Sequence, residues 1–162
     1  MRKSLLSSAL ISLGLASPLA AHHAGETFEL GRLVISHAWM HENAGMAHST
    51  SVYLTIDNQG PDADRLIGAA VDFADEATFQ AQTVDAEGAL EVRDVKGVRI
   101  APDQVLTLKP GVVWIELESV RRTFRQGEHF GMTLTFEKAG TVEIEVEIEP
   151  LDEREHEEGE TS

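Results

Sequence analysis

The feature that most constrains the fold of this chain is a two-residue alternation near its C-terminal end. From Thr141 to Glu149, four aliphatic residues alternate with four glutamates. Because successive side chains of a β-strand point to opposite faces, this pattern predicts a strand with one face in an apolar core and the other in water. Further strands are predicted at 27–30, 33–39, 51–57, 65–71, 112–117 and 132–136.

Turn-forming residues separate these segments, and no stretch shows a long helical repeat. Glycine- or proline-containing turn signals fall at 58–61, 87–88, 109–111, 126–127 and 139–140. Several short strands at such spacing predict an all-β fold, an antiparallel sandwich or Greek-key barrel. The 162 residues include no cysteine, so this fold needs a core that is stable without disulfides, and no thiolate metal site exists.

The first predicted hairpin has a defined register. Leu30 and Leu33 flank Gly31-Arg32, which suits a type II′ turn because glycine occupies its first central position. If Leu30 pairs with Leu33, continuing that register places His22 opposite His41. Cross-strand partners have Cβ atoms roughly 4.5–5.5 Å apart, close enough for both imidazoles to bind one ion.

Residues 1–21 have the pattern of a secretory signal peptide. Arg2 and Lys3 precede an apolar run from Leu5 to Leu15, which is too short for a membrane span. Cleavage after Ala21 fits the small-residue rule, and cleavage after Ala16 is the alternative. We therefore expect a periplasmic protein without a transmembrane anchor in its mature form, with a β-sandwich domain at 22–150 and an acidic disordered tail at 151–162.

Cleavage after Ala21 makes His22 the first residue of the mature chain. Its α-amine and imidazole could then chelate one metal ion, and Cu(II) is the ion best suited to tetragonal nitrogen sites. The α-amine has a reference pKa of only about 7.7–8, so a metal can displace its proton near neutral pH. The alternative is that His22 and His23 form an ordinary frayed terminus.

Charge narrows the range of partners. The chain has 28 acidic and 13 basic residues, a formal net charge of −15, and loses two of the basic residues with the signal peptide. Such a chain repels nucleic acid and anionic membranes and favours cations or basic partners. The tail contains His156 among carboxylates, which is weak evidence for a metal site.

Five segments resemble the PCu(A)C family of periplasmic copper chaperones. They are ISHAW at 35–39, YLTI at 53–56, ADRLIGA at 63–69, LKPG at 108–111 and LTFEKAG at 134–140. The resemblance implies a cupredoxin-like β-sandwich that carries copper towards respiratory oxidases or stores it in the periplasm. It also implies a core position for Trp39 and a structural role for His37.

The copper site that the resemblance implies does not carry over to this chain. Its histidine and methionine positions fall on Gln80, Val92, Trp114 and Glu116, and none of these is a soft Cu(I) ligand. We therefore expect the usual Cu(I) site to be absent.

The loop at 40–48 is instead rich in ligands, with two histidines and two methionines in nine residues. Members resembling this family can use a histidine brace, in which an N-terminal histidine and a second imidazole bind copper. On this reading His22 supplies two nitrogens, His41 or His48 supplies the third, and Met46 or the remaining histidine completes the shell. Copper would then be held as Cu(II) rather than Cu(I). His129 is expected to be a surface histidine.

The predicted role is copper delivery, buffering or scavenging, with a periplasmic or membrane cuproenzyme as the recipient, and not catalysis. Copper monooxygenases with a histidine brace are one rival class, but they need an aromatic substrate face, and this chain has one tyrosine and two tryptophans. A metal-free binding or scaffold protein on the same fold is the other alternative.

Overall fold

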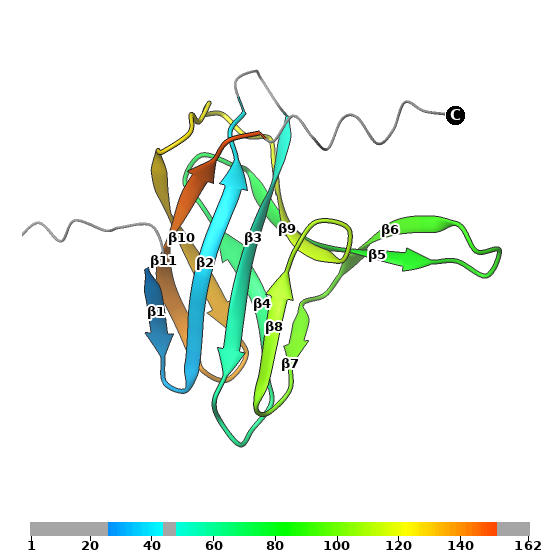
Figure 1. The fold of residues 1–162 in the computed structure, drawn as a ribbon, viewed down its shortest axis with the longest axis vertical. Coiled ribbons are helices and arrows are strands. Elements are labelled where there is room, and N and C mark those ends of the chain that lie inside the picture. The colour runs from blue at the N-terminus through cyan, green and yellow to red at the C-terminus, as the bar shows by residue number, and fades with distance from the viewer. Residues whose placement is uncertain (1–25, 44–47, 152–162) are drawn as a thin grey trace, which may run out of the picture.

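The computed structural model describes residues 26–43 and 48–151, and every regular element in these residues is a β-strand (Figure 1). The strands are β1 (Thr27–Leu30), β2 (Leu33–His41), β3 (Ser49–Asn58), β4 (Asp64–Ala70), β5 (Glu76–Val84), β6 (Leu90–Val95), β7 (Val98–Ile100), β8 (Gln104–Leu108), β9 (Val113–Glu118), β10 (His129–Phe136) and β11 (Gly140–Glu149).

The strands form one continuous curled sheet in the order β6-β5-β9-β3-β2-β11-β10-β4-β7, with β1 on β2 and β8 on β3. Its inner surface encloses the core, so the all-β, cupredoxin-like prediction is confirmed. The ladders are antiparallel except that β11 runs parallel to β2, pairing Glu149 with His41. A purely antiparallel sandwich was expected. The exception arises because β1 covers the edge of β2 only as far as Ser36, and β11 takes that edge from Trp39 onward.

The core follows from the alternation. In β11 the aliphatic residues Ile144, Val146 and Ile148 are buried, whereas the glutamates between them face outward. A cluster of three aromatic rings, from Phe73, Phe124 and Phe130, closes one end of the core with centroid separations of 4.8–5.1 Å. Burial of such side chains stabilises the fold by about 1.5–3 kcal/mol each.

All seven predicted strands are present, with bounds that differ by at most a few residues. The four strands that the pattern does not reveal are β5, β6, β7 and β8. In β6 every residue from Leu90 to Asp94 is exposed, so no contrast between an inner and an outer face marks it as a strand. β7 has three residues, too few to show a period.

The β1–β2 hairpin has the predicted register, with Leu30 opposite Leu33. Gly31 has a φ of +63° whereas Arg32 does not have a positive φ, as a type II′ turn requires. Further along β2, His37 has a φ of +49° and the β2–β3 register shifts between Ser36 and Trp39. This bulge reverses the alternation, so that Ile35 and Met40 both point inward.

Two expectations are wrong because of this geometry. Trp39 is half-buried on the outer face and not in the core, since the bulge turns it outward. The extended pairing of His22 with His41 also fails, because β11 already occupies the edge of β2 at His41. His22 itself lies outside the described residues, as do the predicted signal peptide, Met46 and the tail beyond residue 151.

Candidate metal site

His41 is the last residue of β2, and its side chain is half-buried on the outer face. The ring nitrogen Nδ1 lies 2.9 Å from the carbonyl oxygen of Pro150, which directly follows β11. A carbonyl oxygen only accepts hydrogen bonds, so Nδ1 carries the proton and donates it. The neutral ring then has its lone pair on Nε2. Histidines that bind metals commonly have this arrangement, with the second ring nitrogen bonded to a carbonyl or carboxylate.

Two aromatic residues support the His41 ring. Trp39 meets it edge-on with ring centroids 4.9 Å apart, and the ring of Tyr53, the cross-strand partner of Trp39, lies 4.5 Å from the Trp39 ring. These contacts hold the imidazole in one orientation. The supporting groups were not predicted as functional residues, and the carbonyl of Pro150 has no signal in a sequence. The i, i+2 spacing of Trp39 and His41 does indicate that both lie on one face.

His48 lies at the other end of the ligand-rich loop, one residue before β3. Its side chain is exposed, and within the described residues its ring makes no hydrogen bond. It lines a shallow cavity of about 280 Å³ together with Ser49, Gln80, Glu116, Glu118 and Ser119. The two loop histidines therefore differ: among the described residues, neighbours hold the ring of His41 and none holds that of His48.

Both ends of the loop are attached to the segment that follows β9. The side chain of Asn43 is buried, accepts a hydrogen bond from the Phe124 N–H at 2.6 Å and donates one to the Arg122 carbonyl at 3.3 Å. At the other end, the His48 carbonyl accepts a bond from the Val120 N–H at 3.2 Å. The sequence offers no signal for these anchors, because they depend on the pairing of segments about 80 residues apart.

The four positions that the resemblance assigned to a Cu(I) site do come together. Gln80 on β5 faces Trp114 on β9, Glu116 follows two residues later on the same face, and Val92 on β6 lies opposite Gln82. Glu116 is occupied with its neighbours: its Oε2 accepts bonds from the Ser51 hydroxyl at 2.6 Å and from Trp114 Nε1 at 3.0 Å.

These side chains do not make a Cu(I) site. The methionines of the described residues, Met40 and Met132, are fully buried in the core. In the described ranges, 26–43 and 48–151, no three histidine or acidic side chains lie close enough to hold a metal ion. Among these residues, His129 does lie beside a carboxylate, with its Nδ1 3.3 Å from Oε1 of Glu145 on the adjacent strand.

At the opposite end of the sandwich, two of the family-like segments meet. Asp64 of the ADRLIGA segment is buried, and its carboxylate accepts hydrogen bonds from the backbone N–H groups of Arg65, Lys138 and Ala139 at 2.7–3.0 Å. Burial on its own would raise the pKa of Asp64, but these three bonds and the nearby Lys138 charge outweigh it, and the pKa is lowered. These hydrogen bonds tie the two segments together at this end of the fold.

Known proteins agree with this fold. A family model for LpqE-like lipoproteins matches residues 33–148, most of the chain. This chain belongs to the LpqE-like family. A search of curated proteins finds no match.

Solved PCuAC domains resemble this LpqE-like protein. The apo PCuAC domain from PmoF1 is 27% identical with a TM-score of 0.69, and the copper-bound PCuAC domain from PmoF2 is 25% identical with a TM-score of 0.67. Each match covers 78% of this chain, with all of the PmoF1 domain and 99% of the PmoF2 domain. Apo-DR1885 from Deinococcus radiodurans, 22% identical with a TM-score of 0.58 over 93% of this chain and 99% of its own, shares the fold.

The LpqE-like protein is thus related to copper-binding domains, which supports a chaperone-like role with copper. A family described as lipoproteins is consistent with a location outside the cytoplasm. Within the described residues there is no helix of the length and apolarity that a membrane crossing requires.

Proposed function

We propose that this protein is a periplasmic copper carrier or buffer that holds Cu(II) through His22 and His41. The family and its copper-bound structural neighbour support copper as the cargo. The observation that carries the ligand assignment is the hydrogen bond from His41 Nδ1 to the Pro150 carbonyl, which leaves Nε2 as the metal-binding atom. His22, exposed by signal-peptide cleavage after Ala21, supplies its amine and imidazole, and Met46 or His48 completes the shell.

His22 can reach His41 without forming a strand. Thr27 pairs with Ser36, so the two histidines are each five residues beyond a paired position. Five extended residues span about 17 Å. The segment from Thr27 back to His22 is therefore as long as the segment of β2 from Ser36 to His41. The Cα partner of His41 is Glu149, and further outward glutamates of β11 follow along the same face. Their negative charge favours a divalent cation there.

The proposed donor atoms favour copper in the Cu(II) state over Cu(I). An amine and two imidazoles form a nitrogen set that suits tetragonal Cu(II), whereas Cu(I) prefers thioethers. The solved neighbour CuI-DR1885 from Deinococcus radiodurans holds Cu(I). In the present chain the corresponding face has Gln80, Trp114 and Glu116, so we expect a weaker preference for Cu(I).

The decisive experiment is a Cu(II) titration of protein purified from the periplasm, followed by electron paramagnetic resonance, after intact mass has established the first residue. We expect a His22 start and one stoichiometric nitrogen-rich signal. His41→Ala should lower Cu(II) affinity by more than the about 10–100-fold typical for loss of an outer-shell partner. His48→Ala should change it by less than about threefold. The matched control is His129→Ala, which removes an outer-face histidine beside a glutamate.

The amine can be tested separately. Acetic anhydride near pH 7 acetylates the α-amine in preference to lysine, because their reference pKa values are about 7.7–8 and 10.4. Acetylation should abolish the nitrogen-rich signal while leaving the imidazoles intact. A strong site that survives acetylation, or one lost in His48→Ala and kept in His41→Ala, would contradict the assignment.

The hydrogen bond between Trp114 and Glu116 favours a second candidate, a metal-free binding protein, since these residues satisfy one another at positions where relatives would bind copper. This candidate is correct if the protein takes up copper only weakly and without defined stoichiometry.

A further inference from the structure

The β5–β6 hairpin stands out from the sandwich as an arm (Figure 1). β6 ends the strand order, so among the described strands nothing pairs with its outer edge. Three of the exposed large aliphatic side chains lie on this arm: Val84, Leu90 and Val92 are 64%, 70% and 52% exposed. Val84 faces Leu90 across the hairpin, and Val92 follows Leu90 on the same face. An exposed apolar strand edge is a template for pairing with another strand.

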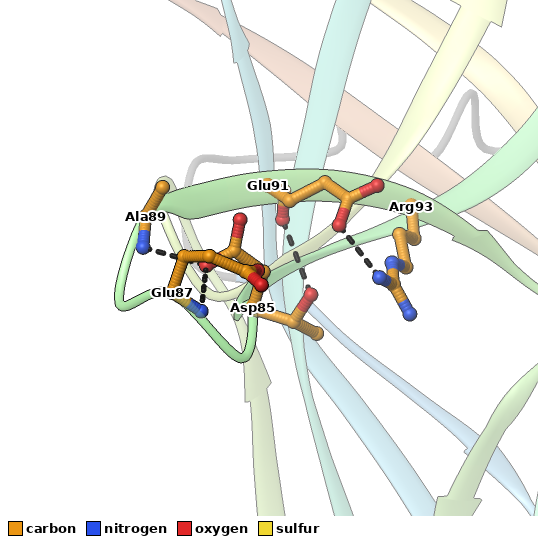
Figure 2. A network of polar contacts seen from close by, with 6 residues as sticks. Asp85, Glu87, Ala89, Glu91 and Arg93 are labelled. Carbon is orange, nitrogen blue, oxygen red and sulfur yellow. Dashed lines mark hydrogen bonds and ion pairs between the residues drawn. The ribbon is translucent and has the colours of Figure 1, made fainter.

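The tip of the arm is well ordered by its own hydrogen bonds (Figure 2). The Asp85 carboxylate accepts bonds from the backbone N–H groups of Glu87 and Ala89 at 3.0 and 2.7 Å. The Asp85 N–H donates to the Ala89 carbonyl at 2.9 Å, which continues the ladder into the turn. The arm therefore presents β6 as a defined strand and not as a loose loop.

The direction of the free backbone groups follows from that ladder. Asp85 and Ala89 form a hydrogen-bonded pair, and bonded and non-bonded pairs alternate along an antiparallel ladder. Glu91 and Arg93 thus direct their N–H and C=O groups towards β5, whereas Leu90, Val92 and Asp94 direct theirs outward. The hydrogen bonds of Gln82, the partner of Val92, support this assignment. Its N–H points away from β6 and donates to the Val112 carbonyl at 3.0 Å.

We propose that β6 pairs antiparallel with β6 of a second copy, about a two-fold axis at Val92, to form a dimer. Because only Leu90, Val92 and Asp94 direct their backbone groups outward, each of them must pair with one of the same three residues in the second copy. With Val92 opposite its own copy, each Glu91 faces Arg93 of the second copy, giving two opposite-charge pairs. A shift by one allowed step in either direction places Glu91 opposite Glu91, or Arg93 opposite Arg93. Like charges directly opposite one another are destabilising.

Side chains on both faces of the arm meet across this register. On one face, the two Val92 side chains lie directly opposite each other, and each Leu90 lies opposite Asp94 and diagonally next to Val92 of the second copy. On the other, Arg93 already bonds to Glu91 along its own strand at 2.6 Å, with both side chains about half exposed. The dimer extends this pair to four alternating charges. Because each copy contributes one six-residue edge, the interface is small and the dimer depends on concentration.

Sedimentation velocity of the full mature protein over a concentration series tests the proposal. We expect the sedimentation coefficient to rise with concentration towards a dimer. Val92→Pro removes an outward N–H but no bond to β5, so it should abolish dimerisation without unfolding the arm. Val92→Thr is the matched control, because it keeps the N–H and the β-branched shape. A monomer at every concentration, or a dimer that survives Val92→Pro, would overturn the proposal.

Charge reversal tests the register itself. Glu91→Arg and Arg93→Glu each place like charges opposite one another, and each should weaken the dimer by about tenfold or more. An equimolar mixture of the two variants should dimerise again, since every pair across the interface is then complementary. A mixture that stays monomeric contradicts the register centred on Val92. Cu(II) titration of the same variants should be unchanged, so this test is independent of the proposed copper site.

Discussion

The two ends of the sandwich differ in how they are stabilised. The end formed by the turns at 59–63 and 137–139, which we call the tied end, contains buried Asp64 and Asn58, whose polar atoms bond to backbone groups across the turns. The end at which β2 ends and β3 begins, together with the residues after β9 and β11, we call the open end, and it contains His41 and His48. Two of the five family-like segments, 63–69 and 134–140, meet at the tied end, whereas the departures from the family lie near the open end and on the arm.

This difference explains how one fold can change its ligands. At the tied end the Asp64 carboxylate accepts hydrogen bonds from three backbone N–H groups. Replacing Asp64 by a residue without an acceptor leaves those N–H groups unpaired. Near the open end, Gln80, Trp114 and Glu116 occupy the outer face of strands whose inner faces make the core. Outer side chains can change from one ligand set to another at little cost to folding, because fold and site depend on different residues.

The largest effect is expected at the tied end. Asp64→Ala leaves three backbone N–H groups without their acceptor, and we expect the free energy of unfolding to fall by about 3 kcal/mol. Urea denaturation measures this loss. The neighbouring exposed Asp62→Ala is the matched control and should change stability by less than about 0.5 kcal/mol. Cu(II) affinity of folded Asp64→Ala should equal that of the unaltered protein, and a parallel loss of affinity would mean that the two ends are coupled.

A smaller loss is expected from Asn43 at the open end. Asn43→Ala removes the acceptor of the Phe124 N–H and the donor to the Arg122 carbonyl, which should lower the free energy of unfolding by about 2 kcal/mol. Asn43 is two residues from His41, so in this variant Cu(II) affinity should fall as well. Asn43→Asp keeps the acceptor and should recover most of the stability. Unchanged copper affinity in Asn43→Ala would show that the loop anchor does not position the site.

Sequence patterns predicted the parts of the fold in which one face is buried. Alternation placed β11, and the Gly31-Arg32 turn placed the first hairpin in its register. The His37 bulge was not visible, because a residue with positive φ in mid-strand has no sequence pattern of its own, and it changed the direction of Trp39 and His41. β6 escaped detection because both of its faces are in water.

The candidate site was only partly predictable. Composition identified the loop with His41 and His48 as a source of ligands. What distinguishes the two histidines is the Pro150 carbonyl, which reaches His41 only because β11 pairs with β2. That parallel pairing joins residues more than 100 positions apart, so no local pattern predicts it.

The pH dependence of stability distinguishes the two ends more finely. The folded pKa of Asp64 is lowered below its reference of about 3.9, so its contribution to stability is complete above that pH and is lost as pH falls through the folded pKa. The stability difference between the unaltered protein and Asp64→Asn should therefore shrink below about pH 4. Denaturation of both proteins between pH 3 and pH 7 measures it, and other carboxylates cancel in the difference. A difference that stays constant to the lowest pH would contradict the lowered pKa.

The smallest effect is expected at Glu116, and it separates the two histidines of the open end. Glu116→Gln keeps an acceptor oxygen for the Ser51 hydroxyl and Trp114 Nε1, so stability should change by less than about 1 kcal/mol. The substitution removes a negative charge from the cavity that His48 lines but leaves the bond between His41 and Pro150 intact. If copper binds at His41, Cu(II) affinity should fall by less than about threefold, since Glu116 lies two strands away on the outer face and its half-buried charge is partly screened by solvent. A loss as large as that of His41→Ala would place copper in the His48 cavity, where a carboxylate and an imidazole would be its ligands.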